Sequence, residues 1–164
     1  MIVLVNDANI LIDLLKLDLI DPFFQLHCEF HVTDLVAAEV LEENVKELER
    51  YVTDGILIKR SFAFEELQEI RLVKNKHPGL SIADCSCVYL STRLSATLLT
   101  GDAVLRRAAK RNRIPVHGLF WVFEELLVQS ILSKKQAHKK LTKLMEINPR
   151  LPKKECQDRL KTWK

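Results

Sequence analysis

Two acidic residues each follow an apolar run that reads as a buried strand. Asp7 closes VLVND after the run at residues 2–5, and Asp102 closes TLLTGD after the run at residues 96–100. In an open parallel sheet, ligands bind beyond the carboxyl ends of the strands. If these two strands are neighbours, the carboxylates face each other, and one takes up a proton unless a cation keeps both ionised. Mg²⁺, which prefers oxygen ligands, would suit such a pair.

Two further acids lie in apolar helical stretches. Glu39 is flanked by Ala38 and Val40 in LVAAEVL, where a carboxylate would be buried unless it lines a site, and Asp84 lies in LSIADCSCVYL. Structural alternatives exist for all four acids. Asp84 stands three residues after a serine, the spacing of a capping box, and Glu39 could face solvent. Asp7 and Asp102 could each cap the following helix.

The elements that must position these acids alternate along the chain. The pattern predicts a helix with Pro22 as its first residue, a helix capped by Thr33 and a helix capped by Ser81. Alternation of strands and helices predicts an α/β fold with a parallel sheet. From residue 119 onward the pattern is helical only. Strands are expected at 2–5, 29–32, 56–59, 96–100 and 114–117, and helices at 10–17, 22–27, 33–52, 61–74, 81–93 and 102–112.

Taken together, the acids and their neighbours form a recognisable set. Asp7-Ala8-Asn9, Glu39, Asp84 and Thr100-Gly101-Asp102, in this order on an α/β frame, resemble the PIN domain family of ribonucleases. The most specific segments are VNDANILIDL at the start and LLTGDAVLRRAA at residues 98–109. The nearest group in appearance is the compact bacterial and archaeal proteins typified by VapC toxins. The resemblance covers roughly residues 1–120, and residues 121–164 are expected to be a basic helical extension packed on the same domain.

The resemblance implies a fold, an activity and roles for residues. The fold would be a three-layer α/β/α sandwich with a five-stranded parallel sheet of order 3-2-1-4-5. Asp7, Glu39, Asp84 and Asp102 would hold one or two Mg²⁺ or Mn²⁺ ions or activate water for RNA cleavage. Asn9 and Thr100 would be supporting polar groups. Many relatives carry a further acid two residues beyond the fourth, where this chain has Val104, which leaves a full second metal site open.

The charge of the chain is strongly asymmetric. Residues 1–102 carry 9 Lys and Arg against 17 Asp and Glu, whereas residues 103–164 carry 16 against 5. A basic region of this kind is the electrostatic footprint of a polyanion, here RNA, or a solvated helix face. The candidates for phosphate contacts near Asp102 are Arg106, Arg107, Lys110, Arg111 and Arg113, with Arg93 in addition, whereas solvation is favoured for Lys134, Lys135, Lys139, Lys140 and Lys143.

Several other classes of protein are disfavoured. The chain has 164 residues, is 48% hydrophobic and has no apolar stretch near the roughly 20 residues that span a bilayer. Without a basic leader before MIVLVND, a cytoplasmic location is expected, where four cysteines would stay reduced. No G-x-G-x-x-G or P-loop occurs.

Two functions of different class remain. The first is a divalent-metal endoribonuclease, which could serve as the toxin of a toxin–antitoxin pair, restrained by a small antitoxin that blocks its acidic pocket. The second is a non-catalytic PIN-like module that binds RNA or a protein. A broad apolar stripe over residues 119–132 favours a core or a homodimer surface.

Overall fold

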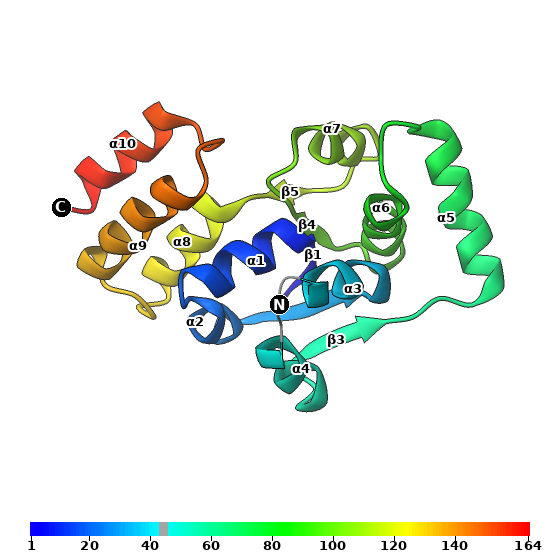
Figure 1. Ribbon diagram of the computed structural model, residues 1–164, viewed down its shortest axis with the longest axis horizontal. Helices are drawn as coiled ribbons and strands as arrows, with labels where there is room; N and C mark the ends of the chain where they lie inside the picture. Colours follow the sequence, from blue (N-terminus) through cyan, green and yellow to red (C-terminus); the bar gives the residue numbers. More distant parts are fainter. Residues whose placement is uncertain (43–45) are drawn as a thin grey trace. The chain divides into compact units, whose positions relative to one another are not determined.

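A computed structural model describes residues 1–42 and 46–164. Within them, parallel strands form one five-stranded sheet of order β3-β2-β1-β4-β5 (Figure 1), which confirms the predicted α/β class and strand order. The strands are β1 (Ile2–Asn6), β2 (Cys28–Thr33), β3 (Leu57–Arg60), β4 (Thr97–Leu99) and β5 (Val116–His117).

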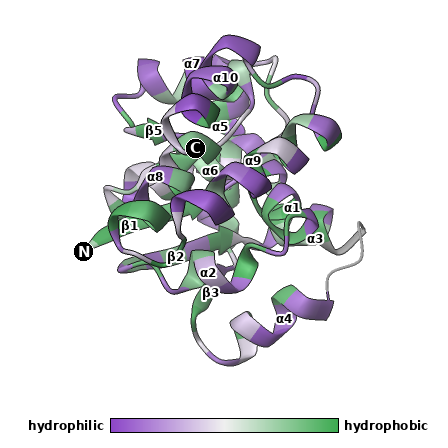
Figure 2. Cartoon of the chain, turned by 90° about the vertical axis from the view of Figure 1, so that its left-hand side faces the viewer, coloured by the Kyte–Doolittle hydropathy of each residue, from purple (hydrophilic) through white to green (hydrophobic). Residues whose placement is uncertain are grey.

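Strand β1 is central and pairs with β2 on one side and β4 on the other. Val5 is in register with His31 of β2 and with Leu98 of β4. Figure 2 shows the hydrophobic colour of β1, whose Leu4 and Val5 are completely buried. Because β1 and β4 are neighbours, the condition under which the acids after them come together is met.

The chain divides into two compact units. The first comprises residues 1–12 and 27–119 and contains the whole sheet. The helices of this unit, besides the beginning of α1 (Ala8–Lys16), are α3 (Asp34–Glu42), α4 (Lys46–Thr53), α5 (Phe64–Lys76), α6 (Ile82–Leu94) and α7 (Ala103–Arg111). Helix α6 packs on β1, β2 and β4, α3 packs on β2 and β3, and α7 packs on β5.

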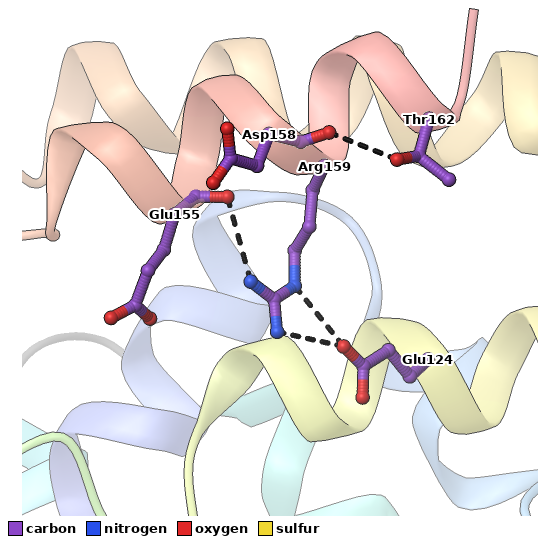
Figure 3. Close-up of polar contacts among 5 residues, drawn as sticks. All are labelled: Glu124, Glu155, Asp158, Arg159 and Thr162. Atoms are coloured by element: carbon purple, nitrogen blue, oxygen red, sulfur yellow. Dashed lines mark hydrogen bonds and ion pairs between the residues drawn. The ribbon is translucent and has the colours of Figure 1, made fainter.

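The second unit comprises residues 13–26 and 120–164 and is helical. It holds the end of α1, α2 (Ile20–Phe24), most of α8 (Leu119–Val128), α9 (Lys134–Ile147) and α10 (Lys153–Thr162). Lys140 of α9 donates to the carbonyl oxygen of Leu17 at 2.7 Å, so the sequence-distant segments are joined. In Figure 3, Arg159 of α10 reaches Glu124 of α8, with Nη2 2.7 Å from Oε1.

Most of the predicted helix boundaries hold, with local differences. Thr33 caps α3 through Val36 N–H, and Ser81 caps α6, as expected. The helix predicted over 33–52 corresponds to α3 and α4, and residues 43–45 lie outside the described part. Pro22 was predicted as the first residue of its helix, which is wrong: α2 begins at Ile20. Proline is tolerated there because the N–H groups of a first helical turn have no helical partner.

Cys85, Cys87 and Cys156 are buried free thiols, and Cys28 is a half-buried one. Among the described helices, none combines the length and the apolar character needed to cross a membrane.

Candidate active site

Asp7 lies at the point where β1 passes into α1 and is buried. Its backbone N–H donates to Leu99 O of β4 at 3.0 Å, which extends the pairing of the two strands by one residue. Its side chain is 5% exposed, with Oδ1 accepting from Ala8 N–H at 2.8 Å. The turn that begins α1 therefore fixes this carboxylate at the carboxyl edge of the sheet.

Thr100, which follows β4, links Asp7 to Asp102. Its hydroxyl donates to Oδ2 of Asp7 at 2.7 Å and accepts from the N–H of Asp102 at 3.0 Å. Asn9 strengthens the same junction, because its Oδ1 accepts from Gly101 N–H at 3.3 Å. The two supporting polar residues expected from the sequence are thus both placed between the strand-end acids.

Asp84 and Glu39 act on Asp7 from two other helices. Asp84 is half-buried in the first turn of α6, and Glu39 is in α3. Burial is the largest cause of the raised pKa of Asp7, and the charges of Asp84 and Glu39 add to it. Burial likewise raises the pKa of the Cys87 thiol, and the charges of Asp7, Asp84 and Glu39 contribute.

The side chain of Glu39 is exposed, which agrees with a solvent-facing position and also with a carboxylate that lines an open site. On α3, the buried face is formed by Val36, Ala37 and Val40. An acidic residue within an apolar stretch can still fall on the solvent side of a helix, and only the orientation of the helix decides this.

Two of the acids also have structural roles. Asp84 completes a capping box with Ser81: its Oδ2 accepts from Ser81 N–H and its own N–H donates to Ser81 Oγ, both at 3.0 Å. Asp102 caps α7, with Oδ1 accepting from the N–H groups of Val104 and Leu105 at 2.8 and 2.9 Å. The capping alternatives are therefore real, and a role in chemistry would come in addition to them.

The pKa of Asp7 is the clearest electrostatic feature of this region. The pKa of Asp7 is raised to about 6: burial is the largest cause, the charges of Asp84 and Glu39 add to it, and the hydrogen bonds from Thr100 and Ala8 partly oppose it. An ionised Asp7 is therefore costly in this position. Shifts of this kind, caused by burial together with neighbouring charges, are typical of functional sites.

The donor set fits a divalent cation in type and in charge. Carboxylate oxygens are the ligands that Mg²⁺ and Mn²⁺ prefer, and a cation would relieve the repulsion that Asp7 experiences. In the part of the chain that the structure describes, however, no three His, Cys, Asp or Glu side chains converge closely enough to form a complete metal cluster. His31 is buried, with Nε2 2.6 Å from Glu29 Oε1.

The basic candidates differ in where the structure places them. Arg107, Lys110 and Arg111 are exposed on α7. Arg93 is nine residues beyond Asp84 on the same helix, about 14 Å along its axis, and its charge acts on Glu66 and Tyr89. Arg93 is therefore not brought to the acids.

Sequence reasoning missed two polar contacts beside the site, one buried and one half-buried. The hydroxyl groups of Thr33 and Ser86 lie 2.9 Å apart and join the start of α3 to α6. The guanidinium of Arg106, expected to contact RNA, donates to Thr100 O at 2.9 Å. No sequence pattern predicts either contact, because each depends on how two elements pack and on the orientation of the side chains between them.

The fold is an α/β domain with a parallel sheet, and acidic residues follow its neighbouring strands β1 and β4. This arrangement is typical of α/β proteins that have an acidic active site at the carboxyl edge of the sheet. The family described as PIN domain (DUF3368) matches residues 3–164. This chain belongs to the PIN domain family, whose fold is of the nuclease type.

A solved structure supports the fold. The chain is similar to the crystal structure of PAE2754 from Pyrobaculum aerophilum, with a TM-score of 0.58 and 18% sequence identity over 77% of this chain and 98% of that one. At this identity the likeness concerns the fold. Among curated proteins, none matches this chain.

Proposed function

We propose that this protein is a divalent-metal-dependent endoribonuclease. The observation that carries the proposal is the buried Asp7, whose pKa is raised to about 6 by burial and by the charges of Asp84 and Glu39. A structural carboxylate at this position would be more stable if its neighbours were neutral. The accumulation of acids at the end of a central strand is explained by a cation and a phosphate substrate.

Asp7, Glu39, Asp84 and Asp102 would hold a Mg²⁺ or Mn²⁺ ion. Their side chains would have to turn toward it, because no three of them converge in the described residues. Whether a second ion binds is left open. The bound metal would supply a water of lowered pKa and neutralise charge on the phosphate. Thr100 keeps the carboxylate of Asp7 in one orientation by donating to Oδ2. Asn9 and the cap made by Asp102 hold the loop between β4 and α7 against α1.

The substrate would be RNA, guided by the exposed cations of α7. Arg107, Lys110 and Arg111 lie on the helix that begins directly after Asp102. Contacts with phosphates position a strand without reading its sequence, so these residues would set affinity rather than specificity. A regulatory role as the toxin of a toxin–antitoxin pair would require a small protein partner that covers the acids. A homodimer is a further expectation.

The experiment that tests the proposal is cleavage of a panel of tRNA and rRNA fragments by the purified full chain in Mg²⁺ or Mn²⁺. EDTA and Asp7→Asn serve as parallel controls. The proposal predicts cleavage that EDTA and Asp7→Asn both abolish. Absence of cleavage by folded protein that is free of co-purified partners, together with absence of Mn²⁺ binding, would contradict it.

A non-catalytic RNA- or protein-binding module is the second candidate, and one observation favours it. Asp84 and Asp102 each already cap a helix, so these acids have a structural reason to be present. Asp102→Asn separates the two candidates, because Asn caps a helix about as well as Asp but removes the charge. Loss of cleavage with unchanged thermal stability supports the nuclease, and unchanged RNA binding with no cleavage by either protein supports the module.

A further inference from the structure

The guanidinium of Arg106 makes a contact that a solvent-facing cation would not need. Its Nη2 donates to the backbone carbonyl of Thr100 at 2.9 Å, and the side chain is half-buried. The next residue, Arg107, is exposed. Two adjacent arginines on α7 are therefore placed in different environments, and only one of them touches the loop that carries the site.

The carbonyl of Thr100 needs this donor because the sheet ends beside it. Thr100 is completely buried, and its N–H donates to His117 O at 3.0 Å. Strand β5 ends at His117, so the strand that would supply the next ladder donor stops there. A buried carbonyl without a hydrogen-bond partner destabilises the fold. The guanidinium takes the place of the missing strand.

Gly118 provides the space for this contact. A Cβ atom at Gly118 would lie 3.0 Å from Arg106 Nη2 and 3.5 Å from Thr100 O. The φ angle of Gly118 is outside the left-handed region, so the backbone conformation does not itself require glycine. The requirement is steric: a Cβ atom here makes the guanidinium shift by a few tenths of an ångström, and a larger side chain would displace it from the carbonyl.

We propose that Arg106 is a positioning residue, which fixes Thr100 so that its hydroxyl remains on Asp7, and that Gly118 is kept small to admit it. Arg106 and His117 hold the backbone of Thr100 at its carbonyl and its amide. The hydroxyl then has one orientation, in which it donates to Asp7 and accepts from the N–H of Asp102. Only the catalytic consequence of this arrangement rests on the proposed nuclease function.

Amide hydrogen exchange of Asp102 tests the proposal without metal or RNA, because the N–H of Asp102 is bonded to Thr100 Oγ1. In Arg106→Gln, exchange of this amide should be about 10-fold faster or more, while the core amides of β1 and β2 are unchanged. Arg107→Gln is the matched control and should leave the amide of Asp102 unaffected. Unchanged exchange in Arg106→Gln would overturn the proposal.

A graded series at Gly118 provides a second test in a different residue. Gly118→Ala requires a displacement of the guanidinium by a few tenths of an ångström and should accelerate exchange at Asp102 slightly, whereas Gly118→Val should accelerate it as much as Arg106→Gln. Gly79→Ala is the control, because a Cβ there meets Val104 only at 3.9 Å. Equal exchange in the valine and wild-type proteins would contradict the steric role.

Cleavage kinetics distinguish positioning from RNA contact. Arg106→Gln should lower kcat about 10-fold with KM unchanged, since a small misplacement of reacting groups is costly, and Arg106→Lys should recover part of the loss. Arg107→Gln should raise KM alone. A rise in KM alone for Arg106→Gln would assign Arg106 to RNA contact and reject positioning. If wild-type protein cleaves no RNA, the proposed function fails, whereas exchange at Asp102 still decides the role of Arg106.

Discussion

Asp7 and Glu124 are two carboxylates in opposite surroundings. Glu124 lies on the surface of the helical unit, where Arg159 forms an ion pair with it at 2.7 Å (Figure 3). Asp7 is buried beside two further acids, and its hydrogen bonds come from a hydroxyl and an amide. Within the described residues, no arginine or lysine forms an ion pair with Asp7. Glu124 is neutralised by a cation of its own unit, whereas ionised Asp7 would carry a charge that an external cation could neutralise.

The largest expected effect is on RNA cleavage in variants of the capping box at the start of α6, where the charge of Asp84 can be removed separately from the cap. Asp84→Asn can still accept from Ser81 N–H but removes the charge, so cleavage should fall by about 100-fold or more if the carboxylate serves the chemistry. Ser81→Ala keeps the charge but removes one cap bond, at about 1 kcal/mol of stability. RNA cleavage rates and unfolding curves of both variants check this. Equal losses of activity in the two variants would assign Asp84 to capping alone.

The neutral pair that joins α3 to α6 should matter next. Thr33→Val removes the hydroxyl that meets Ser86 and caps Val36 N–H, and we expect a loss of about 1–3 kcal/mol in the free energy of unfolding. Thr92→Val is a suitable control, since its exposed hydroxyl bonds only within its own helix. Urea unfolding measures both changes. An equal, small loss in both variants would show that the buried pair contributes no more than an exposed hydroxyl.

The stability of the protein should depend on pH through Asp7. The pKa of Asp7 is about 6 in the folded chain against 3.8 for an unperturbed aspartate. Asp7 therefore does not oppose folding below about pH 4, where it is protonated in both states. As pH rises from there through 6, its ionisation lowers the free energy of unfolding by about 3 kcal/mol. Asp7→Asn cannot ionise. It should therefore be more stable than wild type at pH 8 by about 1–2 kcal/mol, after the loss of a hydrogen bond, and have no advantage at pH 4.

Urea unfolding at pH 4 and pH 8 in EDTA measures this difference. The same difference between the two proteins at both pH values would show that Asp7 is not destabilised when ionised.

The smallest effect concerns the paired acid. Glu124→Gln removes an exposed ion pair with Arg159, and such pairs contribute about 0.2–1 kcal/mol. Cleavage should be unchanged, and thermal unfolding should shift only slightly. A loss of cleavage activity comparable to that in Asp84→Asn would contradict the claim that only the acids of the sheet unit serve cleavage.

The fold and the strand-end acids could be predicted from the sequence because both depend on local patterns. Apolar runs gave the strands, Ser81 marked the start of α6, and the family resemblance gave the strand order. Orientation could not be predicted: Glu39 faces solvent although it is surrounded by apolar residues. Contacts such as Arg106 with Thr100 depend on where the sheet ends. The grouping of residues 13–26 with the C-terminal helices is likewise a tertiary property that no local pattern encodes.

The central claim is that the acids around Asp7 bind a divalent cation, and calorimetric titration of Mn²⁺ into the full chain at pH 7.5 tests it most directly. Asp7→Asn and Glu124→Gln each remove one carboxylate, so they form a matched pair. The account predicts binding by the wild type and by Glu124→Gln, and a large loss of affinity in Asp7→Asn. Equal affinity in all three proteins, or no binding by the wild type, would contradict it.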